Sequence, residues 1–239
     1  MPKFFSQHID GDIISLDKDD SKHIKTVLRA GLGDKITVCD CNGNDYRCVV
    51  CDLGENVKAE IIEKMPCESE SAFKITLFQG LPKSDKMDAI IQKCVEIGVC
   101  AVVPVRTERS IVKIDNKEAK KTERWQKISL SAAKQSGRGI IPEVCTPMVF
   151  KEAVLKAADM DLALIPYENE HKTGIKTALN GFKGKNIAVF IGPEGGFSEG
   201  EIAFAMEKGV VPVTLGKRIL RTETAGPVAC AIILYELEG

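Results

Sequence analysis

The spacing of hydrophobic positions predicts two differently built regions that meet near residue 70. In the first region, short apolar stretches alternate with polar residues at a period of two, which is typical of strands with one buried face. Strands are expected at 13–16, 35–40, 46–52 and 57–64. The Asn-Gly pair at 42–43 favours a tight hairpin. One helix is expected at 19–29, where Ile24, Val27 and Leu28 recur at helical spacing. These elements predict a compact β-barrel.

Beyond residue 71, buried apolar runs alternate with amphipathic helices. This order is typical of a parallel sheet with helices on both faces. Strands are expected at 73–79, 99–105, 143–148, 161–166, 187–191 and 210–215. Helices are expected at 85–97, 116–137, 150–158, 173–182 and 228–234, with another after Ser198. The stretch 65–71 lacks periodicity and is interpreted as a linker. We therefore predict two domains, 1–70 and 71–239.

Two turns near the C-terminus are the best candidates for a ligand site. The first is the glycine-rich run 192–196 (GPEGG), and the second is the run 215–225 (LGKRILRTETA). Both follow expected parallel strands, and ligands of such sheets bind outside the carboxyl ends of the strands. Neither GxGxxG nor GxxxxGK[ST] occurs, which disfavours NAD and ATP phosphate loops. Because Glu194 is the only ionisable group of the first turn, a neutral or cationic ligand is favoured over a polyphosphate.

Composition places the chain among ordinary folded proteins. Hydrophobic residues make up 44% and charged residues 28% of its 239 residues. The first residues lack the apolar core of a signal peptide, and no apolar run approaches the roughly 18 residues of a membrane span. We therefore expect a cytoplasmic protein without a membrane segment.

The distribution of charge says more than the net charge of −1. Residues 83–138 carry thirteen Lys or Arg against seven Asp or Glu, whereas residues 1–70 carry nine against fourteen. A solvated helix face is the usual explanation of such a run, and charge alone favours it. The alternative is an anion-binding surface. Its candidates lie in or beside loops: Lys83, Lys86, Arg106, Arg109 and Arg138.

Four of the nine cysteines fall within thirteen residues, in a CxC and a CxxC arrangement. This spacing raises a zinc site as one alternative. Cys48 and Cys51 differ by an odd number, so they point to opposite faces of the strand expected there. A zinc knuckle would need a turn at that position. Free thiols are therefore favoured, and no metal is expected.

The long helix 116–137 ends in Gln135-Ser136-Gly137-Arg138. A glycine is common at a helix terminus, so a simple C-cap explains the run. Gln135 and Arg138 also bring an amide and a planar cation to one turn, a combination suited to a base edge or a phosphate. Spacing alone leaves both interpretations open.

Several runs of this sequence resemble those of the RsmE family, the 16S rRNA (uracil(1498)-N3)-methyltransferases. The most specific are 191–198 (IGPEGGFS), 215–225 and 132–138 (AAKQSGR). Shorter matches stand in the family's order at 4–5, 27–29, 82–83, 86–87, 92–93, 96–99, 108–110 and 124–128. The resemblance covers nearly the whole chain. Ser131 departs from it, because a glutamate is expected before the paired alanines, and this puts one helix-end contact in doubt.

The resemblance implies a SPOUT-type α/β domain with a parallel sheet and a C-terminal trefoil knot, preceded by a small PUA-like β-barrel that binds RNA. It implies S-adenosylmethionine as cofactor, 16S rRNA in the 30S subunit as substrate, and a homodimer. Knots are too rare for patterning to predict one. Two alternatives stay open: a ribosome-assembly protein that binds RNA without catalysis, and a SPOUT methyltransferase acting on another RNA. From the residues alone, an α/β enzyme acting on a small molecule is a third.

Residue by residue, the resemblance also implies a site. By match to the family's motifs, contacts to the cofactor are expected from Leu81, Gly192, Glu194, Gly195, Leu215, Gly216, Ile219, Leu220 and Ala225. Arg138 and Arg221 are the catalytic candidates, as cations that would stabilise charge developing on the uracil carbonyl oxygens. Gln135 and Thr222 join Arg29, Lys83, Lys86, Arg106 and Arg109 as substrate contacts. Glu223 is one candidate for the base that removes the N3 proton, with hydroxide or a phosphate as the others.

Overall fold

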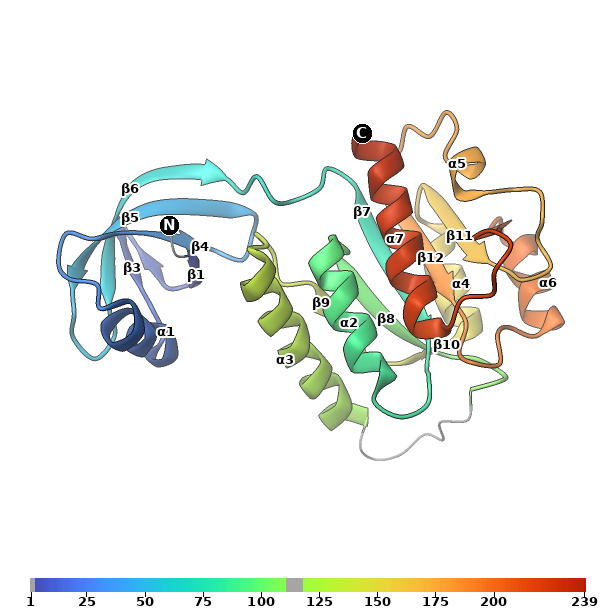
Figure 1. The fold of residues 1–239 in the computed structure, drawn as a ribbon, viewed down its shortest axis with the longest axis horizontal. Helices are drawn as coiled ribbons and strands as arrows, with labels where there is room; N and C mark the ends of the chain where they lie inside the picture. Colours follow the sequence, from blue (N-terminus) through green and yellow to red (C-terminus); the bar gives the residue numbers. More distant parts are fainter. Residues whose placement is uncertain (1–2, 111–117) are drawn as a thin grey trace. The chain divides into compact units, whose positions relative to one another are not determined.

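The computed structural model describes residues 3–110 and 118–239, and the chain forms two compact units (Figure 1). The first unit comprises residues 1–70 together with 133–141. The second comprises residues 71–132 and 142–239. The last turn of the long helix α3 (Glu118–Ser136) and the residues after it therefore fold with the first unit. The predicted start of this helix, at 116–117, lies outside the described residues.

The first unit is built on a six-stranded sheet in the order β1-β4-β5-β6-β3-β2. Its strands are β1 (Lys3–Phe5), β2 (Ile9–Asp10), β3 (Ile13–Ser15), β4 (Lys35–Cys39), β5 (Asn44–Asp52) and β6 (Lys58–Pro66). β1 and β4 are parallel, and the other pairs are antiparallel. Alternate residues such as Ile36 and Val38 fill one core with Ile14 and Leu16, as the period of two predicts. The strand β6 continues to Pro66, two residues into the predicted linker.

The helix predicted at 19–29 is only partly regular. α1 (Lys18–Lys22) is capped by Asp17 and is followed by a π-helix, η1 (His23–Leu28). Ile24 is fully buried, but Val27 and Leu28 are 67% and 40% exposed. The predicted apolar face is therefore wrong for Val27 and Leu28. In a π-helix the i→i+5 bonding widens the turn, so residues three and four apart no longer share one face.

The second unit contains a seven-stranded sheet in which every pairing is parallel. The order is β10-β8-β7-β12-β11-β13, with β9 also pairing β8. The strands are β7 (Lys74–Gly80), β8 (Ala101–Arg106), β9 (Glu143–Val144), β10 (Met148–Val149), β11 (Leu162–Pro166), β12 (Asn186–Ile191) and β13 (Val211–Val213). The strand predicted at 143–148 is thus split in two. Pro147 lacks the N–H that a continuous ladder would use.

Helices cover both faces of this sheet, as predicted. They are α2 (Lys86–Ile97), α4 (Phe150–Ala158), the single turn α5 (Ile175–Ala178), α6 (Glu199–Glu207) and α7 (Thr222–Glu238). Phe78 of β7 packs into a core with α4 and α6. Its neighbours Leu77 and Gln79 point to the other face, where they lie under Gly226 of α7. Figure 1 shows α7 beside α2 over the strands. Of the helix predicted at 173–182, only α5 is helical. Gly174, just before it, is extended and forms a β-bridge to Thr214.

No helix in the described ranges is both long and apolar enough to cross a membrane. All nine cysteines carry free thiols. Within residues 3–110 and 118–239, no group of three or more His, Cys, Asp or Glu side chains is arranged to hold a metal ion.

Candidate functional site

The glycine-rich turn 192–197 connects the central strand β12 to α6. Ser198 caps α6 through a capping box, in which its Oγ accepts from the Glu201 backbone N–H at 3.2 Å while the Glu201 carboxylate accepts from the Ser198 N–H at 2.9 Å. The sequence predicted this cap. A Cβ at Gly192 would lie 3.0 Å from the Cα of Gly196. The turn is therefore folded so tightly on itself that glycine is needed at this point.

The second turn passes beside the first and is joined to it by Thr222. This side chain is only 6% exposed. Its hydroxyl donates to the carbonyl of Gly192 at 2.7 Å and accepts from Nε2 of Gln79 at 2.9 Å. Gln79 is fully buried at the end of β7 and also donates to the carbonyl of Gly80. Sequence reasoning did not select Gln79, although an amide that ends an otherwise apolar strand is a signal that a buried polar contact exists.

A cavity of about 300 Å³ opens between the two turns, and we call it the glycine-loop cavity. Eight of the nine predicted cofactor contacts line it: Gly192, Glu194, Gly195, Leu215, Gly216, Ile219, Leu220 and Ala225. Thr222 lines it as well. Leu81 does not line it, and lies in the wall of a separate cavity. Lys217 and Arg218 of the second turn also line it. So do Tyr167, Glu168 and His171, which follow β11 and were missed from sequence because no motif marks that loop.

Glu194 anchors the glycine-rich turn to the loop after β7. Its carboxylate accepts from the backbone N–H of Lys83 at 3.1 and 3.2 Å and pairs with the Lys86 ammonium at 3.0 Å. Burial acts to raise the pKa of Glu194, but Lys86 and main-chain N–H groups outweigh it and lower that pKa. Lys86 also lies 3.5 Å from a carboxylate oxygen of Glu223, in the first turn of α7. Lys86 therefore connects both walls of the cavity.

The loop after β8 holds the other side of the same turn. Arg109 donates from its guanidinium to the carbonyl of Gly195 at 2.9 Å, and the backbone N–H of Glu108 donates to Glu201 at 2.8 Å. A Cβ at Gly195 would lie 3.3 Å from the Cβ of Arg109. Arg106, three residues earlier, pairs with Glu118 at 2.7 Å. Arg106 and Arg109, both predicted as substrate contacts, thus have a carboxylate and a carbonyl partner, respectively, within the second unit.

Arg221 immediately precedes α7 and is exposed. Its neighbours Leu220 and Thr222 line the glycine-loop cavity, whereas Arg221 itself does not. Among the described residues, no carboxylate lies within ion-pair distance of its guanidinium. The side chain is therefore available to an anionic or carbonyl group of a ligand.

Arg138, Gln135 and Arg29 belong to the first unit and do not line this cavity. Arg138 is 3% exposed, and two of its guanidinium nitrogens donate to the two carboxylate oxygens of Glu70, each at 2.8 Å. Glu70 also accepts from the backbone N–H of Gly139 at 2.6 Å. Burial acts to raise the pKa of Glu70, but Arg138 and these N–H groups outweigh it and lower that pKa. Gln135 and Arg29 are exposed. The catalytic role of Arg138 stays a prediction.

Comparisons with known proteins agree with this geometry. A family model described as an RNA methyltransferase domain matches residues 69–234, and an RNA methyltransferase PUA domain matches residues 16–62. Ribosomal RNA small subunit methyltransferase E of Bacillus subtilis is 36% identical over 231 residues, which cover 94% of this chain and 90% of that protein. The protein of the same name from Mesomycoplasma hyopneumoniae is 34% identical and covers 94% and 95%.

A solved structure supports the same family. Ribosomal RNA small subunit methyltransferase E of Neisseria gonorrhoeae, bound to S-adenosylmethionine, is 36% identical with a TM-score of 0.84, covering 98% of this chain and 96% of that one. The predicted fold class is thereby confirmed, with a PUA-like N-terminal region and a SPOUT-type parallel α/β region. The threading of the trefoil knot stays a prediction. The chain belongs to the ribosomal RNA small subunit methyltransferase E family, the RsmE family.

Proposed function

We propose that this protein transfers the methyl group of S-adenosylmethionine to N3 of uridine 1498 of 16S rRNA in the small ribosomal subunit. The observation that carries this proposal is the glycine-loop cavity, in which two turns that follow different strands of the second unit share one lining and are joined through Thr222. The cavity presents backbone groups, apolar side chains, the carboxylates of Glu194 and Glu168, and the side chains of His171, Lys217 and Arg218. It contains no phosphate-binding fingerprint. These groups fit a cationic adenosyl ligand.

The residues that would hold the cofactor divide by their chemistry. Leu215, Ile219, Leu220 and Ala225 offer apolar surface for an adenine ring. The glycines of 192–196 allow close approach of the backbone. Leu81 lies outside this cavity, so we propose that it supports the cofactor wall through the loop after β7. S-adenosylmethionine supplies an electrophilic methyl group on a sulfonium centre, and the chain contributes its orientation.

We assign the stabilisation of the uracil anion to Arg221. N3 of uracil carries a proton, and removal of that proton places negative charge on N3 and the two adjacent carbonyl oxygens until the methyl group is transferred. A cation nearby would stabilise this anion. Arg221 is exposed beside the cavity and unpaired among described carboxylates, whereas the guanidinium of Arg138 is occupied by Glu70. A positioned cation that acts on developing charge contributes to catalysis directly. Arg138 remains the second predicted catalytic residue, to be tested beside Arg221.

Glu223 is a weak candidate for the base. Its own backbone N–H, and then the Lys86 ammonium, lower the pKa of its carboxyl group, so the carboxylate binds a proton poorly near neutral pH. We propose that hydroxide removes the N3 proton, with Arg221 favouring the anion. The rate should then rise tenfold for each pH unit between about pH 6 and 8. A carboxylate base of lowered pKa is fully ionised across that range, so it would give a flat profile instead.

The remaining RNA contacts, the dimer and the location are also proposals. We propose domains 1–70 and 71–239, with the first binding RNA, and contacts from Arg29, Lys83, Lys86, Arg106, Arg109, Gln135 and Thr222. We propose a homodimer, with the exposed side chain of Tyr235 on α7 as one candidate for its interface. A ribosomal substrate supports a cytoplasmic location.

The test uses 30S subunits from a strain that lacks this modification. The protein and S-adenosylmethionine should produce one reverse-transcription stop at uridine 1498, because a methyl group on N3 blocks the pairing edge. Arg221→Ala should lower turnover at least 100-fold at unchanged cofactor affinity. Cofactor binding with a stop elsewhere would indicate another RNA target. Calorimetric silence at millimolar S-adenosylmethionine would indicate an assembly protein without catalysis.

A further inference from the structure

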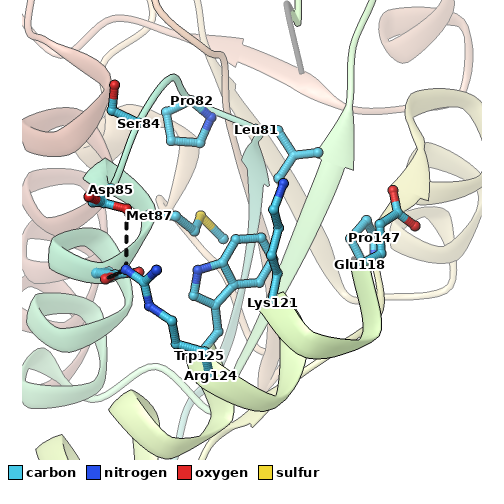
Figure 2. A pocket seen from close by; sticks show the side chains of 11 residues that line it. Leu81, Pro82, Ser84, Asp85, Met87, Glu118, Lys121, Arg124, Trp125 and Pro147 are labelled. Atoms are coloured by element: carbon cyan, nitrogen blue, oxygen red, sulfur yellow. Dashed lines mark hydrogen bonds and ion pairs between the residues drawn. The ribbon is translucent and has the colours of Figure 1, made fainter. Parts of the chain in front are cut away.

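A second cavity of about 240 Å³ lies in the second unit, and it plays no part in the function proposed above. We call it the Trp125 cavity. Its walls are the loop after β7, the start of α2, the first two turns of α3, and Pro147 (Figure 2). Drug-sized ligands occupy about 300–1,000 Å³, so this cavity is suited to a smaller group.

The lining of the Trp125 cavity combines an apolar part, which contains one aromatic wall, with charged side chains. Leu81, Pro82, Met87 and Pro147 surround the indole of Trp125, as Figure 2 shows. Trp125 is only 7% exposed, so packing fixes the position of its ring. A held aromatic ring beside open space is the arrangement on which proteins stack unpaired bases of RNA.

The lining carries three carboxylates and two cations, and four of these five groups are in ion pairs within the described residues. Arg124 pairs with Asp85 at 3.3 Å and with Asp88, and Glu118 pairs with Arg106. Lys121 also lines the cavity, and no acidic side chain of the described residues lies within ion-pair distance of its ammonium group. The result is an apolar slot with an unpaired ammonium group beside it. A neutral planar base joined to an anionic phosphate has the complementary chemistry.

The Trp125 cavity and the glycine-loop cavity share one structural element, the loop after β7. Leu81 and Pro82 line the Trp125 cavity, while Lys83 of the same loop and Lys86, the first residue of α2, hold Glu194 in the lining of the other. The loop contains Ser84 at φ 57°, a left-handed conformation that is uncommon outside glycine and is found near functional sites. An occupant of the Trp125 cavity would therefore contact the loop that fixes the cofactor wall.

We infer that the Trp125 cavity binds an unpaired base of the RNA substrate next to the methylated uridine. The inference rests on the proposed function. The methylated base must reach the cofactor at the glycine-loop cavity, and the two cavities have no lining residue in common, so we treat them as sites for two different groups. Turning the target out of its stack leaves the neighbouring base without a stacking partner. The indole of Trp125 supplies that partner, and Lys121 pairs with the adjoining phosphate.

Trp125 is the single tryptophan of the chain, so its fluorescence reports on this cavity alone. The probes are a single-stranded uridine hexanucleotide and a hexameric ribose-phosphate chain without bases, each end-labelled so that anisotropy measures binding independently. The full-length protein should bind both at low salt, and only the hexanucleotide should quench Trp125. Equal quenching by the two probes, no quenching by bound hexanucleotide, or no binding at low salt would each overturn the inference.

Lys121→Met tests the phosphate contact, with Lys120→Met as the matched control. Lys120 is exposed, carries the same charge and does not line the cavity. The slope of log affinity against log salt for the hexanucleotide should decrease by about 0.7 in Lys121→Met, the value for one single-strand phosphate contact. It should change little in Lys120→Met. Equal slopes for the two variants would contradict the assignment.

Trp125→Leu tests the stacking contact in the methylation reaction. It should raise the KM for 30S subunits at least fivefold, the lower end of what one stacked base contributes, at unchanged affinity for S-adenosylmethionine. Trp125→Phe keeps an aromatic face and should restore most of the loss. A KM unchanged in Trp125→Leu would contradict the contact. If the wild type methylates 30S subunits but its tryptophan is not quenched, this inference fails and the proposed function stands; without methylation, the proposed function itself fails.

Discussion

The two turns that line the glycine-loop cavity are held very differently. The turn 192–197 is fixed by Glu194, by Arg109, by the capping box of α6 and by Thr222. The run 216–219 is exposed throughout, and the N–H of Gly216 donates to the hydroxyl of Thr214 at 3.2 Å. One wall is therefore shaped before the ligand arrives. The other gains most of its contacts from the ligand, and binding must offset the cost of ordering it.

The largest expected effect comes from disturbing the fixed wall at Gly80. A Cβ there would lie 2.6 Å from Cδ and 2.8 Å from the backbone N of Pro193, so Gly80→Ala must displace the glycine-rich turn. We expect about 1–3 kcal/mol of lost stability, the usual cost of overpacking, and at least 100-fold weaker binding of S-adenosylmethionine. Thermal unfolding and calorimetry measure the two effects.

Gly200→Ala is the control for that substitution. Gly200 lies in α6, where a Cβ would meet only Ser198 Oγ at an ordinary 3.9 Å. Alanine favours a helix more than glycine does, so the variant should unfold at the same or a higher temperature and bind the cofactor normally. If Gly80→Ala behaved like Gly200→Ala, the close packing of the fixed wall would be irrelevant to binding.

A smaller effect is expected from Thr222→Val, which removes the hydroxyl that joins the two walls. The substitution leaves the amide of Gln79 and the carbonyl of Gly192 without this partner, at a cost of about 1–3 kcal/mol. We expect roughly tenfold weaker cofactor binding by calorimetry. The exposed Thr224→Val serves as control and should keep wild-type affinity. Equal affinities of the two variants would show that the walls are not coupled through Thr222.

Lys86→Met should have a milder, pH-dependent effect. The Glu194 and Glu223 carboxyls have pKa values lowered below the ordinary 4.5, in part by Lys86. Their stabilisation is therefore present above about pH 4.5 and is lost as the pH falls through the lowered values. The wild type should lose melting temperature between pH 5 and 3 faster than Lys86→Met does. Lys86→Arg should restore the wild-type slope, and parallel melting curves for all three would contradict the ion pairs.

The smallest effect on stability is expected in the exposed wall. Ile219 is 89% exposed, so Ile219→Ser should change the free energy of unfolding by no more than about 0.5 kcal/mol. Its affinity for S-adenosylmethionine should nevertheless fall severalfold, because the side chain is proposed to cover the adenine ring. If Ile219→Ser lost stability but kept its affinity for S-adenosylmethionine, the difference described here between the two walls would be contradicted.

Much of the fold could be predicted from the sequence because its signals are local. The period of two near Ile36, the apolar runs of the parallel sheet and the Ser198 cap each specify one element. The π-helix at His23–Leu28 could not be predicted, since its departure from helical period depends on tertiary packing. The trefoil knot and the roles of individual site residues were predicted only from the resemblance to the RsmE family.

The contacts that assemble the site could not be predicted for another reason. Gln79 and Thr222 are 143 residues apart in sequence, and nothing in either run indicates the other. Glu70 lies in a stretch without periodicity, so no pattern in the sequence indicates its ion pair with Arg138. Arg138 and Arg221 stood as equal candidates until the structure gave one a carboxylate partner and left the other exposed.

The most direct test of the account is transfer of a labelled methyl group from S-adenosylmethionine to unmodified 30S subunits, with the product located by reverse transcription. The account predicts one stop, at uridine 1498, with a rate that falls at least 100-fold in Arg221→Ala while calorimetry shows unchanged cofactor affinity. Full turnover in Arg221→Ala, or a labelled product without that stop, would contradict it.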